Sequence, residues 1–278
     1  MLNGTWASEG YRRLTISDPK PRIIHKATVK DRVLYQAIYQ ILYPIFEEIF
    51  IFDSYSSRVG KGTHAGIRRL RVFLRKLSQN YTKSVYILKC DIRKFFDSID
   101  HTLLKSFLKR DIDCGKTLNL LFLVIDSFHK VVGKGLPLGN VTSQVLANVY
   151  LHYFDSYIKK ELGIRYYLRY NDDFVILAEN QFELYQILLQ VKNFLAYELK
   201  LELHPHKISI RKYHLGVDFL GTVILPHYSV LRTKTKRRFL KKLMRPLTNS
   251  QIESYLGHLS HTKSRRVREL LYKARLRK

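Results

Sequence analysis

The sequence has little cysteine and no long apolar run. Its 278 residues include only two cysteines, Cys90 and Cys114, which excludes a disulfide framework or a zinc cluster. A membrane span needs roughly 18 apolar residues, and the best candidate, 37–52, is interrupted by Glu47 and Glu48. The first residues lack the apolar core of a signal peptide. These absences predict a soluble, cytoplasmic protein of a reducing compartment, without a membrane partner.

Acidic residues are also scarce. Asp and Glu total 23 against 49 Lys and Arg, which gives a formal net charge of +26. This excess indicates a polyanionic partner, because cations placed on phosphates release condensed counterions. The alternative is a basic protein that uses self-repulsion to stay in solution. Over half of the excess lies after residue 230, where apolar residues at helical spacing predict a folded basic element.

The sequence has no repeats, low-complexity tracts or long linkers, which predicts one body over 1–228 and a basic helical region over 229–278. Pro19 and Pro21 disfavour a helix near the N-terminus, and Pro44 predicts a kink or a break in the first helix. Apolar periodicity predicts helices at 33–49, 67–77, 100–108, 143–162 and 181–199, and strands at 85–92, 165–170, 174–178, 207–211 and 219–224. This order predicts an α+β fold in which helices cover one face of a mostly antiparallel sheet.

Carboxylates stand at two predicted strand ends. Asp91 lies near the end of an apolar strand, and Asp172 and Asp173 lie between two short strands that predict a hairpin. In a basic protein, this pattern points to phosphoryl transfer with two Mg²⁺ ions held by oxygen ligands. The alternative is ordinary turn chemistry, because Asp is common in turns. Two adjacent like charges between apolar strands are unfavourable unless a cation binds there, which favours the metal site.

Several segments resemble reverse transcriptases, in the same order along the chain. Residues 170–173, YNDD, resemble the YxDD box, and residues 91–99, DIRKFFDSI, resemble the first catalytic motif. The other matching segments are two finger motifs at 19–38 and 52–67, the template-side motif at 135–151, and the motifs that close the palm at 204–210 and 217–221.

The resemblance implies a right-hand polymerase with fingers, palm and a small basic thumb, acting as an RNA-directed DNA polymerase. Its partners would be a template RNA, the RNA/cDNA duplex and dNTPs. By position, Asp91 and Asp172 would hold two Mg²⁺ ions, for which Mn²⁺ can substitute. The backbone carbonyl of Ile92 would help, and Asp173 would support the site.

The resemblance also assigns residues to the nucleotide and the primer. Phe96 would be the steric gate against a 2′-OH, although a core aromatic is the alternative without the family. Lys207 would protonate or neutralise the leaving pyrophosphate; otherwise it is a surface lysine. The remaining nucleotide-binding candidates are Arg22, Lys30, Arg32, Gly139 and Gln144, of which the cations could instead form a solvated face. The primer and template candidates are Arg58, Ser143, Phe219, Leu220 and Gly221.

The template-side motif indicates a subtype. Group II intron enzymes typically read QGxxxSP, whereas Leu138 to Gln144 has the (I/L)GxxxSQ form that resembles diversity-generating retroelements. Tyr255, Leu256, Gly257, His258 and His261, in SYLGHLSH, also resemble that group. This resemblance implies copying of a template-repeat RNA with errors at adenines. It also implies a basic helical accessory variability protein as a partner, which can be oligomeric.

Two alternatives stay open at this point. One is a reverse transcriptase of a retron, an abortive-infection system or a compact group II-like element. The other is a non-catalytic RNA-binding protein with a polymerase fold, against which the retention of all three acids argues. The chain is too short to include a maturase or an HNH endonuclease region, so intron splicing is not expected. Asn171 departs from the small or apolar residue usual within the YxDD box.

Overall fold

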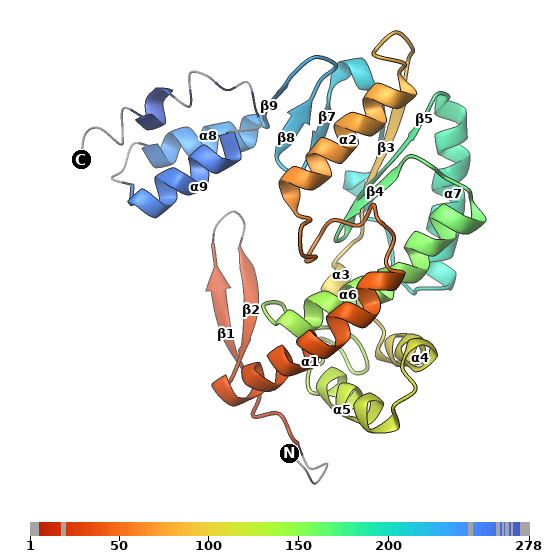
Figure 1. Cartoon of the computed structure of the whole chain (residues 1–278), viewed down its shortest axis with the longest axis vertical. Helices are drawn as coiled ribbons and strands as arrows, with labels where there is room; N and C mark the ends of the chain where they lie inside the picture. The colour runs from red at the N-terminus through yellow and green to blue at the C-terminus, as the bar shows by residue number, and fades with distance from the viewer. Residues whose placement is uncertain are drawn as a thin grey trace.

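The computed structural model describes residues 6–17, 21–243, 247–259, 262, 264, 267 and 269–272 (Figure 1). Pro19 and His261, and the side chain of His258, lie outside the described residues. None of the described helices is long and apolar enough to span a membrane.

The chain begins with a hairpin and a long helix. Strands β1 (Tyr11–Ile16) and β2 (Arg22–Ala27) pair antiparallel, and α1 (Val29–Ile49) follows. Thr28 caps α1 by accepting from the amide of Asp31. The helix continues through Pro44 without the break that the sequence allowed. Pro44 cannot donate to the preceding turn, but the helix is anchored on both sides of it by the buried side chains of Leu42 and Phe46.

The central sheet is antiparallel, as predicted, but it has four of the five predicted strands, because residues 219–224 belong to a separate sheet. They are β3 (Tyr86–Asp91), β4 (Tyr167–Tyr170), β5 (Asp173–Ala178) and β6 (Ser209–Lys212), in the order β4-β5-β3-β6. The strand expected at 207–211 starts two residues later, because Pro205–Lys207 forms a short 3₁₀ turn.

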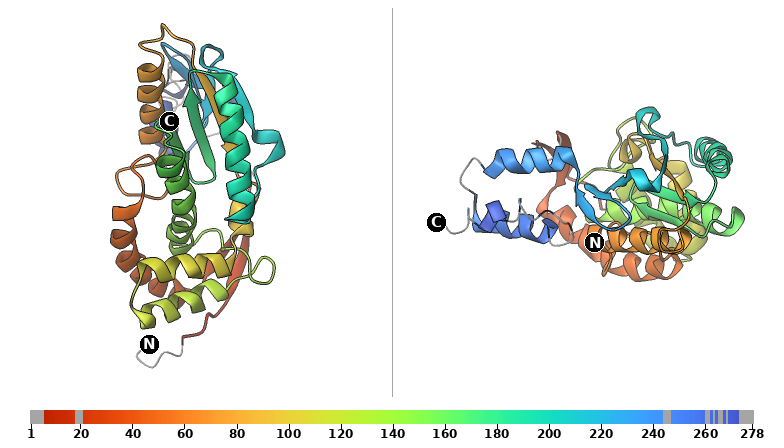
Figure 2. Two further views of the ribbon diagram at one scale, coloured as in Figure 1. Left: turned by 90° about the vertical axis from the view of Figure 1, so that its right-hand side faces the viewer. Right: turned by 90° about the horizontal axis from the view of Figure 1, so that it is seen from above.

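Helices cover both faces of this sheet, not one. Helix α2 (Thr63–Leu77) lies on one face and α7 (Gln181–Tyr197) on the other (Figure 2). Strand β5 explains this, because Val175 and Leu177 join the α2 cluster while Phe174 and Ile176 join the α7 cluster. A strand that is apolar at every position is buried on both sides. The prediction of a one-faced sheet was therefore wrong.

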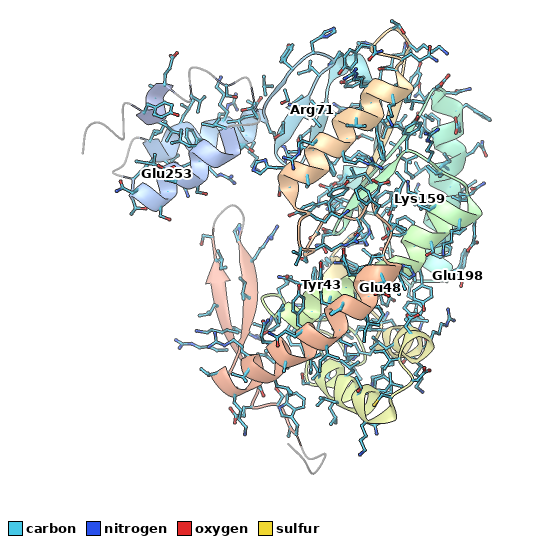
Figure 3. All side chains as sticks on the ribbon, in the orientation of Figure 1. Tyr43, Glu48, Arg71, Lys159, Glu198 and Glu253 are labelled. Atoms are coloured by element: carbon cyan, nitrogen blue, oxygen red, sulfur yellow. The ribbon has the colours of Figure 1, made fainter. Side chains whose placement is uncertain are left out.

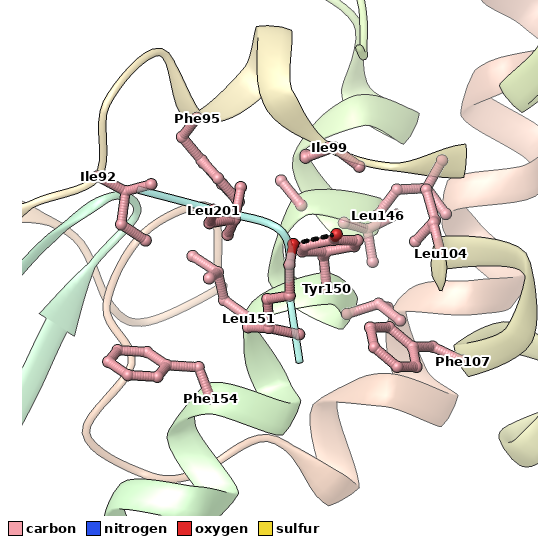
Figure 4. Close-up of a cluster of buried hydrophobic side chains, with 14 of the residues drawn as sticks. Ile92, Phe95, Ile99, Leu104, Phe107, Leu146, Tyr150, Leu151, Phe154 and Leu201 are labelled. Carbon is pink, nitrogen blue, oxygen red and sulfur yellow. Dashed lines mark hydrogen bonds between the residues drawn. The ribbon is translucent and has the colours of Figure 1, made fainter. Parts of the chain in front are cut away.

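Helices between β3 and β4 complete the larger core. They are α3 (Phe95–Ser98), α4 (His101–Asp111), α5 (Gly115–Asp126) and α6 (Val141–Ser156), which continues as a π-helical turn at Tyr157–Glu161. Asp100, where a helix was predicted to begin, caps α4, whereas α5 was not predicted. Tyr150 of α6 lies within the core, where its hydroxyl donates to the carbonyl of Leu199 at 2.7 Å (Figure 4). This bond satisfies a polar group that burial would otherwise penalise.

A second, smaller sheet leads into the C-terminal helices. Its strands are β7 (Val217–Phe219), β8 (Thr222–Ile224) and β9 (Ser229–Leu231), in that order. The single strand expected over 219–224 is a hairpin, because Leu220 and Gly221 turn the chain with φ values of 50° and 84°.

The C-terminal helices are α8 (Thr233–Leu243) and α9 (Asn249–Leu259). They pack with Leu231 in a cluster separate from the rest of the core. The predicted boundary after residue 228 therefore falls between β8 and β9. Strand β9 pairs within the small sheet, and its Leu231 packs with the C-terminal helices. Arg71 of α2 also donates to Ser229 of β9 (Figure 3).

Candidate active site

Strand pairing brings the three acids together. Asp91, the last residue of β3, is the register partner of Asp173, the first residue of β5. Asp172 lies in the turn between β4 and β5, and its carbonyl accepts from the amide of Ile92 at 3.0 Å. Asn171 has a φ of 55°, a left-handed conformation that Asn tolerates better than most residues. Acids far apart in sequence thus lie at one end of the sheet.

Burial and mutual repulsion perturb these carboxyls. Burial, together with the nearby Asp91 charge, raises the pKa of Asp172 to about 6. Burial also raises the pKa of Asp173, although the Lys89 ammonium, 3.5 Å from Oδ1, acts in the opposite direction. Among the described residues, that buried oxygen has no hydrogen-bond partner. The site therefore holds more negative charge than its protein neighbours neutralise.

Lys207 supplies the nearest opposing charge. Its Nζ lies 2.7 Å from both carboxylate oxygens of Asp91. Over the part of the chain that the structure describes, no group of three His, Cys, Asp or Glu side chains is arranged to hold a metal ion. The donors nevertheless suit one, since carboxylates are hard ligands and Asp173 Oδ1 has no hydrogen-bond partner among the described residues. The chemistry of these side chains therefore fits a divalent cation, and the carboxylate oxygens of Asp91 that it would need are paired with Lys207.

A cavity of about 600 Å³ extends from the acids toward the small sheet. Asp91, Asp173 and Lys207 line one part of it, and Val217 and Val223 line another. The Lys89 Nζ donates to the carbonyl of Asp218 on β7 at 2.8 Å, which ties the two sheets together. The β7–β8 hairpin, which carries the primer candidates, is therefore adjacent to the acids. Of these candidates, Phe219 is fully buried, while Leu220 and Gly221 are partly exposed at the turn.

The loop before α6 packs against the N-terminal hairpin. The amide of His25 donates to the carbonyl of Leu138 at 2.9 Å, and Asn140 donates back to the carbonyl of His25. Gly139 is exposed there with a φ of 105°, and a Cβ on it would overlap Ile24. This position requires glycine.

The other nucleotide and template candidates are distributed around this region. Gln144 is exposed in the first turn of α6, whereas Ser143 is buried. Phe96 is half-buried beside Phe95, with ring centroids 5.5 Å apart. Arg22 is exposed at the start of β2.

Two of the cationic candidates lie on the surface of α1. Lys30 forms an ion pair with Glu9 at 3.2 Å. Arg32 lines a shallow groove that also includes Val29 and Val33. Among the described residues, no hydrogen bond or ion pair joins either cation to the acids.

Arg58 differs from the expectation that it contacts the template. Its guanidinium binds both carboxylate oxygens of Glu47 and donates to the carbonyls of Ile51 and Ser54. The side chain is only 4% exposed. With its donors engaged in this way, Arg58 holds the loop before α2 and is not available to a nucleic acid.

Sequence reasoning missed two cations next to the acids, Lys89 and Arg169. Lys89 pairs with Asp173 from β3, and Arg169 is fully buried in β4. Both interrupt apolar strand sequences, YILKCD and YLRY. A charged residue inside such a strand is unfavourable unless it is paired, and this signal could have identified them.

Comparison with known proteins identifies the family of the chain. The family profile described as "Reverse transcriptase (RNA-dependent DNA polymerase)" matches residues 17–224. Protein YkfC of Escherichia coli is 26% identical over 261 residues, covering 80% of this chain and 68% of that protein. The group II intron-encoded protein LtrA of Lactococcus lactis is 25% identical over 168 residues, covering 57% of this chain and 27% of LtrA.

The fold resembles that of solved telomerases. An apo telomerase of Candida tropicalis, truncated from its C-terminal domain, superposes with a TM-score of 0.62 at 15% identity. The match covers 80% of this chain and 55% of that one. The predicted α+β polymerase fold is confirmed. The chain spans only about half the length of this neighbour, and 27% of LtrA.

Proposed function

Because the chain belongs to the reverse transcriptase (RNA-dependent DNA polymerase) family, we propose that it copies an RNA template into DNA by two-metal nucleotidyl transfer at Asp91 and Asp172. The observation that carries the proposal is the pairing of Asp91 with Asp173 beside the turn that presents Asp172. The raised pKa of Asp172 supports it, since a site short of positive charge binds cations.

Each residue of the site has a role in this proposal. Asp91 and Asp172 hold the cations, Mg²⁺ or Mn²⁺, with the Ile92 carbonyl and Asp173 in support. When bound, such ions activate the attacking 3′-hydroxyl and stabilise the leaving oxygen. Lys207, released from Asp91, neutralises the leaving pyrophosphate. Phe96 lies under the sugar and disfavours a 2′-OH.

Other proposed contacts position the substrates. Arg22, with Lys30 or Arg32, covers the incoming triphosphate, since fixed cations stabilise charge in phosphoryl transfer. Gly139 and Gln144 lie on the template side of the nascent pair. The β7–β8 turn at Leu220 and Gly221 holds the primer end. The basic C-terminal helices grip the duplex through its phosphates.

We further propose that the template is the template-repeat RNA of a diversity-generating retroelement, copied with errors at adenines. The support is the Leu138 to Gln144 segment, whose Gln144 side chain is exposed at the start of α6. An amide there offers hydrogen bonds that the proline of group II intron enzymes does not. The large positive charge suits a ribonucleoprotein that includes an accessory variability protein.

The decisive experiment is primer extension on an RNA template with dNTPs and Mg²⁺. Wild type is compared with Asp172→Asn and with Asp113→Asn, which changes an exposed carboxylate. We expect extension by wild type and Asp113→Asn and none by Asp172→Asn. Extension by Asp172→Asn at the wild-type rate contradicts the assignment of Asp172.

Sequencing of the products tests the subtype. Misincorporation concentrated opposite template adenines supports the retroelement proposal. Accurate products favour the second candidate, a group II-like enzyme, which the similarity to LtrA supports. No extension by wild type, with the cognate RNA and accessory protein supplied, favours an RNA-binding protein.

A further inference from the structure

Arg169 is the largest fully buried side chain in the described part of the protein. It lies two residues before the turn at Asn171 and Asp172, the catalytic turn of the proposed reaction. Its partner is Asp155 of α6, which is also fully buried. Nε and Nη2 of Arg169 donate to the two oxygens of Asp155 at 2.8 and 2.6 Å. Tyr167 donates to the same carboxylate at 2.6 Å. This bidentate pair fixes the plane of the guanidinium.

Further hydrogen bonds from Arg169 make a second contact to α6 and reach two other segments. Nη1 donates to the side chain of Asn148 on α6 at 3.2 Å and to the carbonyl of Asn171 in the turn at 3.1 Å. Nη2 also donates to the hydroxyl of Ser54 at 3.2 Å. One side chain thus joins the catalytic turn, α6 and the loop before α2.

The loop that carries Ser54 is itself fixed. Its neighbour Asp53 accepts from Arg69 Nε at 2.7 Å and from Lys159 Nζ at 3.3 Å (Figure 3). The backbone of this loop pairs with β4, since the amide of Tyr55 donates to the carbonyl of Arg169 at 2.9 Å. The turn is therefore connected to elements that cannot easily move.

We infer that Arg169 is a positioning residue for the reaction: by holding the carbonyl of Asn171, it fixes the left-handed turn that presents Asp172. The predicted loss of kcat rests on the proposed polymerase activity, whereas the predicted effect on the turn does not. A planar guanidinium is needed here, because a lysine ammonium cannot contact Asp155, Asn148 and Asn171 in the same arrangement.

The test compares Arg169→Lys with a matched control, Tyr167→Phe. Both variants weaken contacts to Asp155, but only Arg169→Lys removes the fork that contacts the turn. We expect kcat for single-nucleotide addition to fall at least about tenfold in Arg169→Lys, because small misplacements of catalytic groups are costly. The KM for the dNTP stays within about twofold, because ground-state binding is not altered. Tyr167→Phe loses stability but keeps kcat within about twofold of wild type.

Amide hydrogen exchange, without template or metal, gives a second readout. We expect faster exchange in Arg169→Lys for peptides covering 86–93 and 167–178, which include the Ile92 amide that donates to Asp172. Exchange over α7 stays at the wild-type rate, since α7 lies outside the network. Tyr167→Phe leaves the turn peptide unchanged.

Two outcomes overturn the inference: unchanged exchange at the turn in Arg169→Lys, or equal losses of kcat in both variants. If Arg169→Lys does not fold, Arg169→Met with Asp155→Asn removes both buried charges and the donor to Asn171 together. The same results are expected for it, and a folded double variant with wild-type exchange and kcat overturns the inference. A wild type that fails to extend primers contradicts the proposed function alone, because the exchange comparison does not depend on activity.

Discussion

Neutralising Asp172 should stabilise the protein while abolishing its activity. Its pKa rises from 3.8 to about 6 in the fold, because burial and the Asp91 charge oppose ionisation. Between these values the folded state binds more protons than the unfolded state, so stability falls as pH rises through this window. Above pH 7, the rise of about two pKa units lowers the free energy of unfolding by about 2 to 3 kcal/mol. Asn has nearly the shape of Asp but no charge, so the Asp172→Asn variant avoids this loss of stability.

The assay is urea unfolding in EDTA at pH 8 and pH 4.5. We expect the unfolding free energy of Asp172→Asn to exceed that of wild type by about 2 to 3 kcal/mol at pH 8 and by about 1 kcal/mol at pH 4.5. At pH 4.5 the wild-type carboxyl is almost fully protonated in the folded state, but it is largely ionised in the unfolded state. Asp113→Asn, at an exposed site, should stay within about 0.5 kcal/mol of wild type. Mg²⁺ should stabilise wild type more than Asp172→Asn, by mass action. A variant no more stable than wild type at pH 8 refutes the reasoning.

Three further substitutions test other parts of the site. Phe96→Ala should raise ribonucleotide incorporation relative to deoxyribonucleotides about tenfold in primer extension; an unchanged ratio removes Phe96 from sugar selection. Gly139→Ala should lower the free energy of unfolding by about 1 to 3 kcal/mol, because φ is 105° and the new Cβ overlaps Ile24; unchanged urea unfolding contradicts this. Lys207→Met should tighten Mn²⁺ binding about two- to fivefold, measured by electron paramagnetic resonance, since the competing ion pair to Asp91 is partly exposed. Weaker binding would show that Lys207 does not compete.

Local patterns in the sequence predicted much of the fold. The long periodic helix predicted at 33–49, the helix predicted to begin at Asp100 and the hairpin around residues 171–172 all have signals confined to a few residues. Among the elements that were missed, α5 is apolar around much of its circumference and lacks a side-chain cap. The hairpin at Leu220 was hidden because only Gly221 of its two turn residues signals a left-handed conformation.

The sequence predicted the acids of the site and the cation Lys207, but not the other cations near them. Motif order identified Asp91 and Asp172, and strand pairing then placed Asp173 opposite Asp91. The partners of cations depend on tertiary contacts that no spacing encodes. Arg58 was expected on a nucleic acid but is bound to Glu47, while Arg169 was not singled out at all.

The antiparallel register of β3 and β5 also has a consequence for protein synthesis. Between these strands the chain must first complete α3 to α6, so their pairing is a contact between residues far apart in sequence. Such contacts form late, because loop closure comes before any pairing energy is gained. Domains fold from the N-terminus as they leave the ribosome. A nascent chain that has reached only α6 therefore contains Asp91 alone of the three acids, and Lys207 is added after all of them. The proposed active site is therefore complete only when translation is well advanced.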